Sequence, residues 1–132
     1  MAHILVVDDV EVVRLVISKI LKRDGHTVME AGGGAAALDE IARRIPDAVI
    51  TDLWMPAVDG FHLIETIKAR HPAVAIIAMS GGSPRHSQQD SLDKARSAGA
   101  TQLLDKPIDK DELVTAVRDA LGGVTAIQGA RA

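Results

Sequence analysis

Short runs of apolar residues alternate along the whole chain with stretches in which apolar residues recur every three or four positions. The first pattern is typical of β-strands and the second of amphipathic helices. The apolar runs predict five strands, at residues 3–7, 27–31, 48–52, 73–80 and 101–105. A helical pattern follows each strand. The first three are at 13–21, ended by Gly25, at 35–44, ended by Pro46, and at 61–67, ended by Pro72. The fourth helix is expected to end at Gly99, and the fifth covers 113–121.

Five strand–helix units in succession predict an α/β protein with a parallel sheet covered by helices on both faces. Residues 73–80 form the most continuously apolar run and are expected in the sheet centre, whereas the more polar 27–31 suits an edge. With neither a linker nor a repeat, the sequence indicates one domain over residues 1–122 and a flexible tail over 123–132.

The composition of the 132 residues narrows the class of protein. The chain has no cysteine, a net charge of −3 and 2% aromatic residues. These values exclude disulfides and thiolate metal sites and argue against nucleic-acid binding. No apolar run approaches the length of a membrane span, about 20 residues, so we expect a cytoplasmic protein with no membrane partner. The five histidines (3, 26, 62, 71 and 86) lack the spacing of metal ligands and are expected at the surface.

Polar residues stand where four of the predicted strands end. Asp8 and Asp9 follow the first strand, Asp52 ends the third, Ser80 the fourth, and Lys106 follows the fifth. The carboxyl ends of parallel strands share one edge of the sheet, where ligands of doubly wound proteins bind. We therefore expect three carboxylates, a hydroxyl and an ammonium group to meet at this edge.

Clustered carboxylates require a cation, and an all-oxygen set without histidine or cysteine favours Mg²⁺. Together with Lys106, a divalent ion would neutralise the three carboxylates formally. The central Asp52 is then suited to attack phosphorus as a nucleophile, with the transferred phosphoryl group bound by the metal, Lys106 and Ser80.

Four motifs at these strand ends give the chain a resemblance to a known family. They are "VVDD" (6–9), "DLWMPAVDG" (52–60), "MSGG" (79–82) and "DKP" (105–107). In this order and spacing, over roughly residues 3–121, the chain resembles the receiver domain of two-component response regulators, in particular the single-domain chemotaxis regulators. The resemblance implies a flavodoxin-like (βα)5 sandwich with sheet order 2-1-3-4-5.

The resemblance also implies residue roles in a Mg²⁺ site. Asp52 would be the phosphoacceptor, phosphorylated by a histidine kinase or a histidine phosphotransfer protein. Asp9 would bind Mg²⁺ directly, Asp8 mainly through water, and Trp54 through its backbone carbonyl. Asp52 would also be one of the metal ligands.

Further residues would bind the phosphoryl group and transmit its presence. Ser80 and Lys106 would contact it, and the peptide bond before Pro107 would be cis. Leu103 stands where the family usually has an aromatic switch residue. Phosphorylation would change the surface of helix four, strand five and helix five, where an unknown target would bind. This surface is also where receivers of the family usually dimerise.

Two loops depart from the family pattern. Residues 80–99 look longer than in short receivers, and the three glycines at 32–34 suggest a flexible turn.

Three other functions remain as alternatives. The chain could be the receiver fragment of a longer regulator. It could be a Mg²⁺-dependent phosphohydrolase that uses an aspartyl phosphate, although Trp54, two residues after Asp52, offers no acid or base. A flavin-binding module shares the topology, but the acidic segment 8–13 opposes a phosphate. A receiver that acts as a signalling switch rather than as an enzyme explains the most residues.

Overall fold

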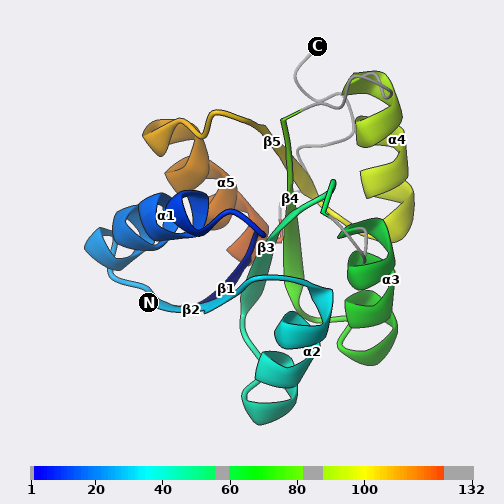
Figure 1. The fold of residues 1–132 in the computed structure, drawn as a ribbon, viewed down its shortest axis with the longest axis horizontal. Helices are drawn as coiled ribbons and strands as arrows, with labels where there is room; N and C mark the ends of the chain where they lie inside the picture. The colour runs from blue at the N-terminus through cyan, green and yellow to red at the C-terminus, as the bar shows by residue number, and fades with distance from the viewer. Residues whose placement is uncertain (1, 56–59, 82–87, 124–132) are drawn as a thin grey trace.

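The structure, a computed structural model, describes residues 2–55, 60–81 and 88–123, with only the backbone at 88–92. Five strands alternate with five helices in this part of the chain (Figure 1). The strands are β1 His3–Val7, β2 Thr27–Ala31, β3 Ala48–Asp52, β4 Ala75–Ser80 and β5 Gln102–Asp105. The helices are α1 Glu11–Arg23, α2 Gly34–Arg43, α3 Gly60–Arg70, α4 Gln88–Ala98 and α5 Lys110–Leu121.

All strand pairs are parallel, and the sheet order is β2-β1-β3-β4-β5. The predicted fold class and strand order are therefore confirmed. The strand 27–31 lies at an edge, as its polarity predicts, and β4 is fully buried over its last five residues. The predicted loop before helix four and the tail after residue 123 lie outside the described residues.

Helices cover both faces of the sheet, because alternate strand residues point to opposite sides. Helices α1 and α5 pack on one face, against side chains such as Ile4, Val6 and Ile50. Helices α2, α3 and α4 pack on the other face, against Leu5 and Val49. Figure 1 shows this division into two helical layers, with α1 and α5 on one side of the sheet. The turns between each strand and the next helix consequently gather at the carboxyl edge.

One expectation about the histidines is wrong. His3 is only 6% exposed, because β1 carries it into the sheet beside β2, and its Nδ1 lies 2.9 Å from Thr27 Oγ1. Within the described residues, no helix has both the length and the apolar character needed to cross a membrane.

Candidate functional site

The end of β1 presents Asp8 and Asp9 in very different surroundings. Asp8 is completely buried, whereas Asp9 is exposed. The Asp8 N–H donates to the Ala31 carbonyl of β2 (3.2 Å), which continues the sheet by one residue. The Asp8 carboxylate also accepts a hydrogen bond from the Val10 N–H (2.9 Å). Asp8 thereby closes the tight turn that leads from β1 into α1.

The end of β3 presents Asp52, which is 4% exposed. Its Oδ1 accepts a long hydrogen bond from the Trp54 N–H (3.5 Å). Helix α3 begins directly against this strand end, and a Cβ atom at Gly60 would overlap the Asp52 carbonyl oxygen. The glycine that follows "MPAVD" in the motif is therefore required by the close approach of α3 to the acidic strand end.

Lys106 follows the edge strand β5 and reaches the carboxylates at the ends of β1 and β3. Its N–H donates to the Ser80 carbonyl (2.9 Å), which holds the end of β5 against the end of β4. Its Nζ lies 2.7 Å from Asp8 Oδ2 and 3.4 Å from Asp52 Oδ2. The peptide bond between Lys106 and Pro107 is cis. Lys106, which is 98 positions from Asp8 in the sequence, thus provides the positive charge beside Asp8 and Asp52.

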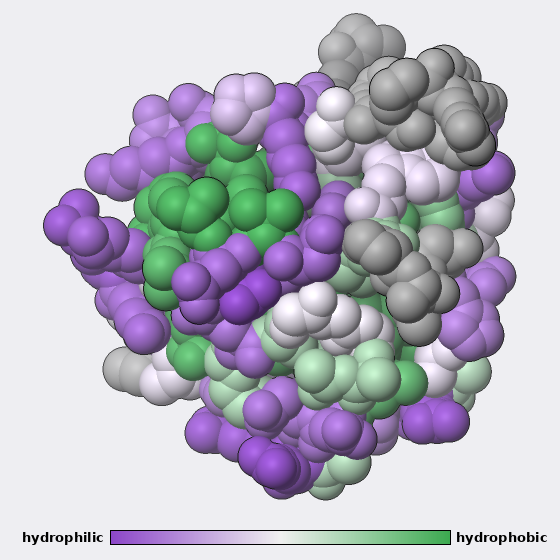
Figure 2. All heavy atoms as spheres, in the orientation of Figure 1, coloured by the Kyte–Doolittle hydropathy of each residue, from purple (hydrophilic) through white to green (hydrophobic). Residues whose placement is uncertain are grey.

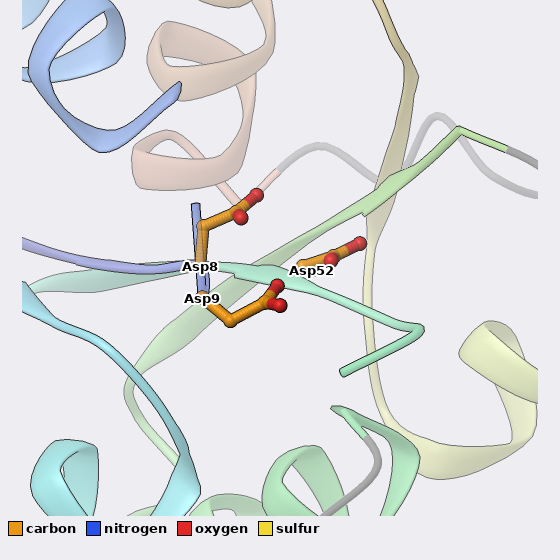
Figure 3. Close-up of side chains that lie close together, drawn as sticks. All are labelled: Asp8, Asp9 and Asp52. Atoms are coloured by element: carbon orange, nitrogen blue, oxygen red, sulfur yellow. The ribbon is translucent and has the colours of Figure 1, made fainter. Parts of the chain in front are cut away.

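The three carboxylates converge as the strand-end rule predicts. One oxygen from each of Asp8, Asp9 and Asp52 lies within 4.8 Å of the others. Figure 3 shows Asp8 and Asp9 extending from the end of β1 toward Asp52 at the end of β3. Three carboxylate oxygens with no nitrogen or sulfur donor suit a hard divalent cation such as Mg²⁺. The donor set therefore fits the metal that the sequence implies.

Burial and the charges in this cluster shift the pKa values of Asp52 and Lys106. Burial raises the pKa of Asp52, the Lys106 ammonium opposes this effect, and the Asp8 carboxylate adds to it. Burial disfavours the charged form of Lys106, but its hydrogen bonds and attraction to Asp8 and Asp52 prevail and raise the pKa of Lys106. Lys106 is therefore held as an ammonium group beside two carboxylates.

The other predicted site residues lie around this cluster. Ser80 is 1% exposed at the end of β4 and pairs in register with Asp105 of β5. Trp54 follows β3, with its ring against Phe61 of α3 in an edge-to-face contact (centroids 5.1 Å apart). Leu103 is half-buried on β5 and packs on the core under α3 and α4.

The structure adds two residues that the sequence reasoning missed. Arg14 of α1 donates from Nη1 to the Asp8 carbonyl oxygen (2.7 Å) and from Nε to Glu30 Oε1 of β2 (3.3 Å). The available signal was a charged residue, Glu30, inside an otherwise uncharged edge strand. Pairing it with Arg14 requires knowing that α1 packs over β2.

Comparison with known proteins agrees with this geometry. Residues 4–118 match the family model described as the response regulator receiver domain. The chain is 37% identical over 116 residues to the DNA-binding transcriptional regulator NtrC of Escherichia coli K12, which covers 88% of this chain. It spans only 24% of that relative. It is 28% identical over 118 residues to sporulation initiation phosphotransferase F of Bacillus subtilis, covering 89% of this chain and 92% of that protein.

Solved structures give the same result. A response regulator receiver domain protein from Clostridium thermocellum superposes with a TM-score of 0.84 at 30% identity, covering 93% of this chain and 96% of that one. The receiver domain of NtrX from Brucella abortus superposes with a TM-score of 0.83 at 32% identity, covering 90% and 98%. Fold, converging strand ends and family match agree, and the chain belongs to the response regulator receiver domain family.

Proposed function

We propose that this chain is a phosphoacceptor switch of a two-component or phosphorelay system, in which Asp52 receives a phosphoryl group from a phosphohistidine. The donor would be a histidine kinase or a histidine phosphotransfer protein in the cytoplasm, and residues 1–122 would form the receiver. One observation carries the proposal: Asp8, Asp9 and Asp52 converge within 4.8 Å beside the Lys106 ammonium.

Asp52 is the proposed nucleophile. One of its carboxylate oxygens forms a bond to phosphorus, and the bond between phosphorus and the donor's imidazole nitrogen breaks, with its electron pair remaining on that nitrogen. The attack requires the ionised carboxylate. Lys106 favours this form by placing its ammonium 3.4 Å from Asp52 Oδ2, against the effect of burial.

Lys106 and Ser80 are the proposed ligands of the transferred group. Because the Lys106 pKa is raised, its ammonium stays charged and can follow the phosphoryl oxygens as they gain charge. Ser80, at the adjacent strand end, would offer a hydroxyl. The hydrogen bond between the Lys106 N–H and the Ser80 carbonyl keeps these two residues together.

Asp9, Asp8, Asp52 and the Trp54 carbonyl are the proposed holders of Mg²⁺. When bound, Mg²⁺ supplies electrostatic stabilisation of the charge on the transferring group. Asp9 is suited to direct ligation because its carboxylate is exposed and has no partner among the described residues. Both oxygens of Asp8 are already engaged, by the Val10 N–H and by Lys106, which supports its indirect role through water.

Helix α1 offers the proposed docking surface for the phosphohistidine donor. Four large apolar side chains are 45–63% exposed at its start and along it: Val10, Val12, Leu15 and Val16. Figure 2 shows this hydrophobic patch over α1. An apolar groove of about 230 Å³ is lined by Val12 and Val16 of this patch and by Lys106 and Pro107, so the patch adjoins the lysine that pairs with Asp52. A donor that covers the patch would bring its histidine beside Asp52.

The proposed output surface is formed by α4, β5 and α5. Leu103 of β5 packs against the core cluster that includes Ala95 and Ala98 of α4. A shift of Ser80 toward a phosphoryl group would alter the space beside Leu103 and α4. An aliphatic residue would thereby take the place of an aromatic switch in passing the change to a target or to a second copy of the chain.

Emission of Trp54, the only tryptophan, tests the proposal. We expect Mg²⁺ to change the emission and beryllofluoride to change it further, because both would bind beside the Trp54 backbone. Asp52→Asn should keep a weakened Mg²⁺ response and lose the beryllofluoride response. An equal beryllofluoride response in wild type and Asp52→Asn would rule out Asp52 as the acceptor.

A further inference from the structure

Arg14 lies at the point where three elements meet behind the acidic cluster. Its guanidinium group connects α1 with the Asp8 carbonyl after β1 and with Glu30 on β2. Its side chain is 16% exposed and that of Glu30 is 29% exposed. Both residues lie outside the proposed nucleophile, metal ligands and phosphoryl ligands, so the proposed function leaves this pair unexplained.

The backbone at Asp8 and Asp9 is fixed by its carbonyl as well as by its N–H. The Asp8 N–H is paired with Ala31 across the sheet (3.2 Å), but the Asp8 carbonyl has left the strand ladder. Arg14 Nη1 binds that oxygen at 2.7 Å, a short, charge-assisted hydrogen bond. The oxygen belongs to the peptide group that joins Asp8 to Asp9, so Arg14 sets the orientation of this peptide.

Asp9 depends on that peptide more than the other acidic residues do. Asp8 is held through its side chain by Val10 and Lys106, and Asp52 by Trp54 and Lys106. In the described part of the chain, by contrast, nothing hydrogen-bonds to the Asp9 carboxylate. Its position therefore follows from its backbone, whose preceding peptide is bound by Arg14.

Glu30 gives Arg14 its own fixed position. The Nε–Oε1 contact of 3.3 Å anchors the guanidinium to β2, one residue before Ala31, whose carbonyl accepts the Asp8 N–H. The same short segment of β2 thus supports both sides of the Asp8 backbone. Partners that orient a metal ligand from behind commonly change metal affinity without contacting the metal.

We propose that Arg14, anchored by Glu30, is a positioning residue that orients the Asp8–Asp9 peptide and thereby places the Asp9 carboxylate for Mg²⁺. The inference rests on the proposed function, because it assigns Asp9 as a metal ligand. Arg14 acts through the backbone and contacts neither the metal nor the phosphoryl group.

The test measures the Mg²⁺ dissociation constant from Trp54 emission in the wild type and in four variants. Arg14→Met keeps the apolar stem and removes the donors, whereas Arg14→Lys retains the positive charge and one donor nitrogen. We expect Mg²⁺ to bind about tenfold more weakly to Arg14→Met and about threefold more weakly to Glu30→Gln, with Arg14→Lys within about twofold of the wild type. Arg43→Met is the matched control, because Arg43 pairs with Glu40 at 3.9 Å on the exposed side of α2, with its side chain 78% exposed.

A second measurement separates positioning from a general loss of stability. In Mg²⁺-free buffer, the NMR signal of the Asp9 amide should shift in Arg14→Met but not in Arg43→Met. Recovery of Mg²⁺ affinity in Arg14→Lys supports positioning. Mg²⁺ affinity within twofold of the wild type in Arg14→Met, or an equal loss in Arg14→Lys, would overturn it.

Two further outcomes are decided by the same experiment. Should Arg14→Met fail to fold, Glu30→Gln decides, and an unchanged Mg²⁺ affinity in that variant overturns the inference. A wild type without any Mg²⁺ response would contradict the proposed function itself. A normal wild-type response with unaffected variants would contradict only the role of Arg14.

Discussion

Strand β3 has a carboxylate at each end, and the two ends differ in what surrounds it. Asp47 immediately precedes the strand, is exposed, and accepts a hydrogen bond from the His3 N–H (2.8 Å). Asp52 ends the strand, is 4% exposed, and faces two further carboxylates with Lys106 as the shared cation. The amino end of the sheet is locally paired, whereas the carboxyl end gathers more negative charge than its lysine balances.

This difference separates an end whose carboxylate is paired within the chain from an end whose carboxylates are suited to bind a cation. Uncompensated carboxylates at close range disfavour their own ionisation, so the carboxyl end is most favourable with a bound cation. The amino end gains its stability from hydrogen bonds within the chain and needs no ligand. The same substitution of a charged side chain at the two ends should therefore have opposite or unequal effects on Mg²⁺ affinity and on folding stability.

The largest expected effect comes from removing the cation at the carboxyl end. Lys106→Met should slow phosphorylation by acetyl phosphate about 100-fold, because it removes a fixed positive charge from the transferred group. Lys110→Met, four residues further at the exposed start of α5, should leave the rate unchanged. Equal rates in Lys106→Met and wild type would show that Lys106 is only a structural partner of Asp8.

A smaller effect is expected when one carboxylate is neutralised at each end. Asp9→Asn should weaken Mg²⁺ binding at least about tenfold, because the cation loses a charged oxygen ligand. Asp47→Asn should leave Mg²⁺ affinity unchanged. Titration of both variants by Trp54 emission checks this. A similar loss in both would mean that net charge, rather than the cluster, determines binding.

Folding stability should respond with opposite signs at the two ends of β3. Asp52→Asn should increase the free energy of unfolding by roughly 1 kcal/mol at pH 7, because it removes a buried charge while Asp8 keeps Lys106. Asp47→Asn should decrease it by roughly 1 kcal/mol, because it weakens the hydrogen bond to His3. Urea unfolding without Mg²⁺ measures both values.

The sign of the Asp52 effect also depends on pH. Burial raises the Asp52 pKa above its value in the unfolded chain, so ionisation costs stability as pH rises through the folded-state pKa. The advantage of Asp52→Asn should consequently disappear at acidic pH. A destabilised Asp52→Asn at neutral pH would contradict the description of the carboxyl end as electrostatically unfavourable without a cation.

The smallest expected effect concerns His3 at the amino end. Burial and, to a lesser degree, the charge of Arg44 lower the His3 pKa, whereas Asp47 raises it. The contribution of neutral His3 to stability is therefore full above the unfolded-state pKa of about 6.5 and is lost as pH falls through the lower folded-state pKa. His3→Gln should reduce the loss of thermal stability between pH 7.5 and pH 5, while the exposed control His62→Gln should not. An identical pH dependence in His3→Gln and wild type would remove His3 from this account.

Much of the candidate site could be predicted from the sequence, because the topology alone brings the strand ends together. Five apolar runs predict the parallel sheet, and its order places Asp8, Asp9, Asp52 and Lys106 at one edge. The environment of each carboxylate could not be predicted. Asp8 and Asp9 are adjacent in the sequence, yet Asp8 is completely buried and Asp9 is exposed. Asp8 continues the pairing of β1 with β2, whereas Asp9 lies in the turn that follows.

Contacts between elements that are distant in the sequence could not be predicted from it either. His3 is buried because β1 and β2 pair in a register that sets it beside Thr27, and no pattern of apolar residues fixes that register by itself. Arg14 and Glu30 meet only because α1 packs over β2. Local periodicity predicts which elements form, but the angle and depth at which they pack determine these partners.

Mapping the phosphoryl group along the chain would identify the acceptor residue itself. The protein is incubated with Mg²⁺ and acetyl phosphate, and the modified residue is identified by mass spectrometry in wild type, Asp47→Asn and Asp52→Asn. We predict a single phosphoryl group on Asp52 in wild type and Asp47→Asn, and none in Asp52→Asn. A phosphoryl group on any other residue in the wild type, or undiminished incorporation in Asp52→Asn, would show that Asp52 is not the acceptor.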